Sequence, residues 1–194
     1  IRNYIHLDEI VLVKSKGYNL WKGNNPETKV EGYFNKFENF KNLQFQLENL
    51  KQDKFYEINR DNVFLKEAYK NISQNPHKYS ELFFKKILSL FFFNLNSSYP
   101  NYYSYLHIVP IFLVSFLSFP GLILFQKDKK FFEGNYLILY LLFNLIVFSV
   151  FFILPRTKLV ILPIQIILAS QAVIYFYSKL RLSKKINDFY LKIR

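Results

Sequence analysis

The sequence predicts an α-helical membrane protein in which three transmembrane helices follow a small, mainly helical extracytoplasmic domain and an interfacial amphipathic helix. Three observations support this class. Long stretches of the C-terminal half lack charge, amphipathic patterns recur in the N-terminal half, and positive charge gathers beside the uncharged stretches. The 51% hydrophobic and 20% aromatic content excludes a disordered chain, and the absence of cysteine excludes a disulfide framework.

The first elements are a strand and a helix. Residues 4–13 end in the run IVLV and predict a strand. Apolar residues then recur at intervals of three and four, which predicts an amphipathic helix over 38–55. These apolar positions are Phe40, Leu43, Leu47 and Leu50.

A second helix follows, with Asp61 as its candidate N-cap and Asn75-Pro76 as its end, because the residue before a proline disfavours helical backbone. Its apolar face has a helical spacing. The residues on that face are Phe64, Leu65, Ala68, Tyr69 and Ile72.

Residues 77–93 predict a third helix, too short to span a membrane, with Lys85 and Lys86 on its polar side. Two interpretations stay open. A basic amphipathic helix just before a span lies in the membrane interface, or it packs its apolar side on the small domain. The apolar side consists of Leu82, Phe83, Ile87, Leu90 and Phe91.

Three stretches predict membrane spans because they carry no formally charged residue: 105–125 over 21 positions, and 136–154 and 159–177 over 19 positions each. Helices of this length extend about 28 to 32 Å, which matches the hydrocarbon core of a bilayer. The alternative, three fully apolar helices buried in a soluble domain of this size, is disfavoured.

Positive charge predicts the orientation of the spans. The loop 126–135 and the tail after residue 177 together hold nine lysine and arginine residues, whereas the hairpin 155–158 holds two. We therefore expect the loop and the tail to be cytoplasmic, and residues 1–103 and the hairpin to be extracytoplasmic.

These expectations divide the chain into four parts. They are an extracytoplasmic domain over 1–76, an interfacial helix and connector over 77–103, a three-helix transmembrane region over 104–178, and a basic cytoplasmic tail over 179–194.

The segment 17–26, GYNLWKGNNP, predicts an ordered loop, because its glycines permit positive φ, its asparagines favour turns and Pro26 stops a helix. The loop carries the only tryptophan, Trp21. Amides and an aromatic face suit a sugar, whose hydroxyl groups form hydrogen bonds while its C–H face stacks on a ring. The alternative is that Trp21 anchors the loop in the headgroup region.

Four segments together resemble the C-terminal part of bacterial polytopic glycosyltransferases of the GT-C type, relatives of the dolichyl-phosphate-mannose protein mannosyltransferases. They are the opening IRNY, the loop 17–26, the helix that ends at Asn75-Pro76 with two lysines after it, and RTKLVILP at 156–163. The loop is the most specific of the four.

The resemblance implies an integral protein of the bacterial inner membrane that moves a sugar from a polyprenyl-phosphate carrier to an extracytoplasmic acceptor. The catalytic acidic residue of that family lies in the first extracytoplasmic loop, upstream of the part that this chain resembles. Because Ile1 is not an initiator methionine, we expect a C-terminal fragment whose partner is the missing N-terminal transmembrane half. No catalytic residue is expected within the chain.

Candidate substrate-binding residues follow from the same reasoning. Arg156 stands in a short hairpin beside a span, where a guanidinium group suits the phosphate of a lipid carrier, although such residues also serve as interface anchors. Lys158 and Arg2 are weaker candidates for that phosphate. Asn24 and Asn25 join Trp21 as candidate sugar contacts.

Other chemistries find no support in the sequence. The three histidines have no metal-ligand spacing with carboxylates, so we expect no metal and no cofactor within the chain. The net charge of +12 does not indicate nucleic-acid binding, because much of the excess lies beside the predicted spans.

The predicted function is therefore the distal part of a membrane glycosyltransferase, with the lipid bilayer and a polyprenyl-phosphate-linked sugar as partners. The alternative is a non-catalytic, membrane-anchored interaction domain of the cell envelope. A polysaccharide polymerase or ligase of the same compartment shares the predicted topology.

Overall fold

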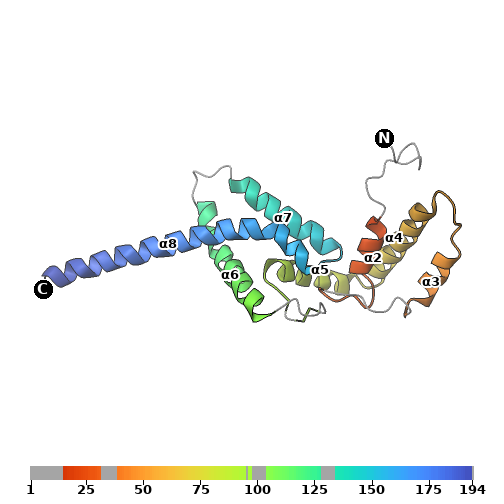
Figure 1. The fold of residues 1–194 in the computed structure, drawn as a ribbon, viewed down its shortest axis with the longest axis horizontal. Helices are drawn as coiled ribbons and strands as arrows, with labels where there is room; N and C mark the ends of the chain where they lie inside the picture. Colours follow the sequence, from red (N-terminus) through yellow and green to blue (C-terminus); the bar gives the residue numbers. More distant parts are fainter. Residues whose placement is uncertain (1–14, 32–38, 95, 98–103, 128–133, 194) are drawn as a thin grey trace. The chain divides into compact units, whose positions relative to one another are not determined.

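The computed structural model describes residues 15–31, 39–94, 96–97, 104–127 and 134–193 (Figure 1). These residues form seven α-helices and contain no strand. The mainly helical class is therefore confirmed for the described part of the chain. The strand predicted over 4–13 lies outside the described residues.

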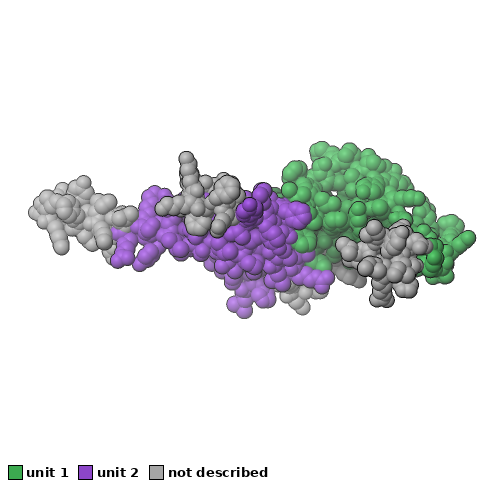
Figure 2. All heavy atoms as spheres, turned by 90° about the horizontal axis from the view of Figure 1, so that it is seen from above, with its two compact units in different colours: residues 1–90, 94–100, 146–155 green, residues 91–93, 101–145, 156–194 purple. Residues whose placement is uncertain are grey.

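The chain divides into two compact units, coloured separately in Figure 2. Unit 1 combines residues 1–90, 94–100 and 146–155, and unit 2 combines 91–93, 101–145 and 156–194. The sequence does not indicate that residues 146–155, which end the second uncharged stretch, group with the N-terminal helices.

Unit 1 is built from four helices and the end of a fifth. They are α2 (Lys16–Gly23), α3 (Lys41–Glu48), α4 (Tyr56–Gln74), α5 (Pro76–Phe91) and the last turns of α7 (Gly134–Val150). Helices α2 and α3 both pack on α4. The core between them consists of Leu20, Trp21, Leu43, Phe64 and Ala68.

Helix α4 confirms the predicted apolar face at Phe64 and Ala68, which are 1% and 0% exposed. Helix α3 is shorter than the predicted helix over 38–55, but Leu43 in its centre is buried as the pattern indicates. The exposed Tyr69 is the exception on the α4 face.

The predicted role of Asp61 as the N-cap of its own helix is wrong, because α4 begins five residues earlier at Tyr56. Its carboxylate instead accepts hydrogen bonds from the backbone N–H groups of Gly17 and Tyr18, both at 3.0 Å. These are the free donors of the first turn of α2, whose own N-cap Ser15 makes no side-chain cap. Asp61 therefore caps α2 from a neighbouring helix.

The predicted loop over 17–26 is also wrong for most of its length, because residues up to Gly23 are helical. Neither Gly17 nor Gly23 adopts positive φ. A Cβ atom on Gly17 would lie 2.0 Å from the backbone oxygen of Asp61, so this glycine allows α2 to approach α4 closely. The glycines mark close helix packing.

Unit 2 contains α6 (Tyr105–Lys127), most of α7, and α8 (Lys158–Ile193), which follows a 3-10 turn at Pro155–Thr157. Helices α6 and α8 pack against each other. Gly121 makes this possible, because a Cβ atom there would lie 1.9 Å from the backbone oxygen of Leu168. Figure 1 shows α8 as one continuous helix, which runs beyond the predicted end of the span at residue 177.

Two helical segments are long and apolar enough to cross a membrane: Leu106–Phe125 and Pro155–Arg181. In length and composition they match the first and the last of the three predicted spans. The remaining stretch, the second in chain order, forms a helix that stops at Val150, shorter than the predicted 136–154. Its apolar part, Tyr136–Val150, falls short of the length of the other two.

Candidate functional site: a groove at the ends of two helices

The turn after α2 gathers the predicted sugar-contacting residues. Trp21, inside the last turns of α2, is 0% exposed, and its ring lies 5.1 Å from the ring of Phe64 and 5.2 Å from that of Phe40 between centroids. Such aromatic packing stabilises a core. In this structure the ring belongs to the core of unit 1 and offers no face to a sugar or to a headgroup layer.

Asn25 is fully buried and shapes the turn. Its side-chain nitrogen donates to the backbone oxygens of Trp21 and Lys22 at 3.2 and 3.3 Å, and its Oδ1 atom accepts from the N–H of Glu27 at 2.9 Å. The side chain therefore satisfies helix-end carbonyl groups and an Asx turn. These contacts occupy the polar atoms that the sequence interpretation assigned to a ligand.

Asn24 is placed differently from its neighbour. Its Nδ2 atom donates to the backbone oxygens of Leu20 at 2.8 Å and of Val150 at 2.7 Å. Two carbonyl acceptors fix the orientation of the amide, because the reversed amide would bring oxygen against oxygen. Its Oδ1 atom accepts no hydrogen bond from the described residues and is left facing a groove.

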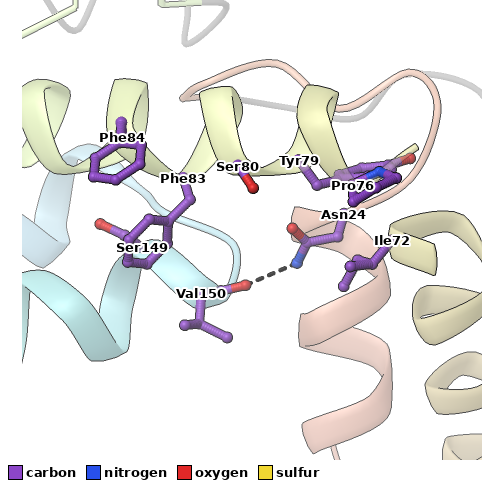
Figure 3. Close-up of a pocket in the computed structure, with 9 residues that line it drawn as sticks. All are labelled: Asn24, Ile72, Pro76, Tyr79, Ser80, Phe83, Phe84, Ser149 and Val150. Carbon is purple, nitrogen blue, oxygen red and sulfur yellow. Dashed lines mark hydrogen bonds between the residues drawn. The ribbon is translucent and has the colours of Figure 1, made fainter. Parts of the chain in front are cut away.

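That groove has a volume of about 410 Å³ and lies entirely within unit 1. This size falls in the range of small-molecule sites. Figure 3 shows the groove between the first turns of α5 and the last turn of α7, with Asn24 beside it. The residues that line it are Asn24, Ile72, Pro76, Tyr79, Ser80, Phe83, Phe84, Ser149 and Val150.

Three polar side chains of this lining, Tyr79, Ser80 and Ser149, were not singled out from the sequence. Ser149 is 1% exposed, and its Oγ atom has no hydrogen-bond partner among the described residues. Burial raises the pKa of the Tyr79 hydroxyl, which stays protonated near neutral pH. In the sequence, Ser149 is one small residue within an uncharged stretch, so no local signal distinguishes it from a packing residue.

Lys86 fixes the framework of the groove. The sequence predicted it on the polar side of its helix, and this prediction is wrong, because the side chain is 1% exposed. Its Nζ atom donates to the backbone oxygen of Gly23 at 2.7 Å and to that of Phe151 at 2.9 Å. These oxygens stand at the C-terminal ends of α2 and α7, where helix dipoles favour a cation.

Gly23 and Phe151 meet at this point. A Cβ atom on Gly23 would lie 2.5 Å from the backbone carbon of Phe151, so only glycine fits there. Burial lowers the pKa of Lys86 to about 7, since its two acceptors are neutral carbonyl groups and desolvation disfavours the charged form. A neutral lysine amine keeps two N–H groups, so Nζ can donate to both helix ends in either protonation state.

Helix α5 presents a different outer face from the one predicted. Leu82, Lys86 and Leu90 point into the protein, whereas Phe84 and Leu88, four residues apart, are 63% and 58% exposed. Leu82 and Leu90, on the predicted apolar side, are 8% and 1% exposed. The exposed pair leaves an apolar strip for a further contact.

Two of the three predicted phosphate-binding residues, Arg156 and Lys158, lie in unit 2. Arg156, in the 3-10 turn before α8, is exposed. Lys158 is 7% exposed, and its Nζ atom donates to the backbone oxygen of Phe92 at 2.8 Å. Gln165 donates similarly to Phe91 at 2.7 Å, so these two side chains hold residues 91–92 against α8.

Two predictions remain without a structural test. Arg2 lies outside the described residues. Within the described part of the chain, no group of three or more histidine, aspartate or glutamate side chains is placed to hold a metal ion.

No protein-family model matches this chain, and neither the curated proteins nor the solved structures contain a match to it.

Proposed function

We propose that the chain is the distal part of an integral membrane glycosyltransferase that takes a sugar from a polyprenyl-phosphate carrier and transfers it to an extracytoplasmic acceptor. The reaction is inferred from the resemblance in the sequence, and the structure supports a location in a membrane. Only 22% and 33% of an apolar 18-residue stretch in each of the two candidate spans are buried within the protein, so most of these apolar side chains face outward. A soluble core helix would be mostly buried, whereas lipid covers exposed apolar side chains.

Helix α7 completes the proposed three-span topology. Its 17 residues extend about 26 Å, at the lower end of what a spanning helix requires. With this helix as a span, residues 1–103 and the turn before α8 share the extracytoplasmic side of the bacterial inner membrane.

The observation that carries the proposal is the position of Arg156. Its exposed guanidinium group stands directly before the apolar α8, in the turn that leads into the helix. Backbone N–H groups and the dipole at a helix N-terminus favour an anion, and a guanidinium group binds phosphate oxygens in pairs. The lipid-linked phosphate of the donor is an anion at the depth where such a helix enters the membrane.

A transfer assay tests the proposal. The full-length parent protein, purified in detergent, is incubated with a polyprenyl-phosphate sugar, and release of polyprenyl phosphate is measured. We expect Arg156→Ala to reduce turnover at least about tenfold and Arg156→Lys to restore part of it, since lysine keeps the charge but loses the paired geometry.

The matched control is Lys179→Ala, which removes an exposed cation near the other end of the same apolar segment. It is expected to leave turnover unchanged. If Arg156→Ala is as active as the unsubstituted protein, Arg156 does not bind the donor phosphate. If the parent protein transfers no sugar at all, the proposed function is wrong.

The alternative, a membrane-anchored interaction domain, draws support from the exposed pair Phe84 and Leu88 on α5. An apolar strip of this kind is typical of a protein or membrane contact. Replacing Leu88, which does not line the groove, by serine separates the two functions, because it would weaken partner capture in an interaction domain but leave sugar transfer intact in the enzyme.

A further inference from the structure

The groove of unit 1 has a composition that selects among ligands. None of the described residues that line it is charged, so they offer no charge complement to a phosphate or a carboxylate. Its walls are mainly apolar and aromatic, with Phe83, Phe84 and Tyr79 from α5 on one side (Figure 3). A ligand that fits this surface is neutral and has at least one apolar face.

Two polar atoms at the groove exclude a purely apolar occupant. Among the described residues, the Ser149 hydroxyl is buried without a hydrogen-bond partner, and no group donates to the Asn24 Oδ1 atom, whose amide nitrogen already donates to two carbonyl oxygens. A hydrocarbon chain in the groove would take water from the Asn24 oxygen without replacing it, and it would leave the Ser149 hydroxyl, which is already closed to water, without a partner. A ligand with hydroxyl groups would satisfy both.

We propose that this groove binds a single sugar ring. The ring hydroxyls pair with Ser149 and Asn24 Oδ1, and the apolar C–H face of the ring lies against the aromatic side chains of α5. A volume of about 410 Å³ accommodates one ring with water at its edges. The choice of a sugar among neutral polar rings rests on the proposed function.

The framework around the groove is rigid in the way a binding site requires. The backbone oxygen of Val150, which lines the groove, accepts a hydrogen bond from Asn24. Lys86 donates to the backbone oxygens of the next residue, Phe151, and of Gly23 at the end of α2. A preorganised site loses less entropy when it binds a ligand.

The test is ligand binding by the full chain in a detergent without a sugar headgroup. The probes are methyl α-D-mannopyranoside, methyl β-D-galactopyranoside and N-acetyl-D-glucosamine, observed by saturation-transfer NMR and by fluorescence of the only tryptophan, Trp21. We expect saturable binding of at least one probe. Ser149→Ala should weaken it about tenfold, the value of one hydrogen bond, and Ser149→Leu should abolish it by filling the groove.

The stability of the ligand-free protein distinguishes a ligand contact from a structural role. Because the Ser149 hydroxyl has no partner, Ser149→Ala should leave the melting temperature unchanged or raise it while binding weakens. The matched control is Ser170→Ala on α8, whose hydroxyl already donates to the backbone oxygen of Ile167 at 2.7 Å and which should not alter binding.

The proposal is overturned if no probe binds saturably, or if Ser149→Ala and Ser149→Leu bind as tightly as the unsubstituted protein. Its failure is distinct from that of the proposed function. If Ser149→Leu transfers sugar with an unchanged KM, only the proposal that the groove binds the sugar fails. If the probes bind saturably but no transfer is seen, the proposed enzyme function fails and the sugar-binding groove stands.

Discussion

The Nζ atom of Lys86 lies 2.7 Å from the backbone oxygen of Gly23, in a site where the lysine side chain is 1% exposed. The same nitrogen lies 2.9 Å from the backbone oxygen of Phe151. One side chain of α5 thus closes the C-terminal ends of two helices whose residues are more than 120 positions apart in the sequence. Removing this contact should disturb both helix ends together.

The first prediction concerns the pH dependence of this contact. The pKa of Lys86 is about 7 in the folded protein and 10.5 as its ordinary value, so the unfolded chain binds more protons between these two pH values. The free energy of unfolding should therefore rise with pH from about 7 towards 10. Lys86→Met should lack this rise and should be less stable by about 1–3 kcal/mol at the alkaline end, where two carbonyl groups lose their donor.

Unfolding followed by Trp21 fluorescence at several pH values measures this difference. Lys85→Met is the matched control, because Lys85 is exposed and pairs with Glu81 at 2.6 Å on the surface. Its effect should stay below about 1 kcal/mol. Parallel pH profiles for Lys86→Met and the unsubstituted protein would contradict the assignment.

The second prediction concerns Asp61 as the cap of α2. Asp61→Ala removes both acceptors of the N–H groups of Gly17 and Tyr18 and should lower the free energy of unfolding by about 1–2 kcal/mol. Chemical denaturation followed by Trp21 fluorescence measures the loss. Glu57→Ala, one turn earlier on α4, removes an exposed carboxylate with only a 4.0 Å ion pair and should have little effect. Equal losses in the two variants would refute the cap.

The third prediction concerns the packing of α6 on α8. Gly121→Ala places a methyl group where the backbone oxygen of Leu168 stands 1.9 Å away, so the two helices must separate. We expect a loss of about 1–3 kcal/mol, measured as a lower midpoint in thermal unfolding monitored by circular dichroism. Leu113→Ala on the same helix, at a position 51% exposed, should change the midpoint much less. A midpoint unaffected by the alanine at 121 would argue against this close contact.

The fourth prediction concerns α7 as a membrane span. The chain has no cysteine, so single cysteines can be placed at Lys41 and Lys185 and treated with an impermeant thiol reagent in intact cells. Three spans put these positions on opposite sides, so the cysteine at 41 should react and that at 185 should not. Equal labelling of the two would mean that α7 does not cross the membrane.

The sequence predicts those features that depend on local periodicity. The apolar face of α4, with Phe64 and Ala68 in the core, follows from a spacing of three and four residues. The two long apolar helices follow from runs without charge. Both patterns concern a single helix and its surroundings, which the order of residues alone determines.

The sequence does not predict features that depend on contacts between distant segments. Lys86 has the pattern of a solvent-exposed lysine, but the carbonyl groups that receive it come from the ends of two other helices. Asp61 has the residue type of an N-cap, but the helix that it caps lies 44 residues earlier. The groove depends on Ser149 and Asn24, 125 positions apart, and no periodic signal connects them.

The contact between Gly23 and Phe151 also limits the motion available to α7. Lys86 reaches both backbone oxygens at hydrogen-bond distance, and the absence of a side chain at Gly23 leaves no gap between the two segments. A slide of α7 along its axis by the rise of one residue, about 1.5 Å, would break at least one of these bonds. The C-terminal end of α7 is consequently fixed within unit 1. A force along that helix would therefore act on the turn that holds Asn24.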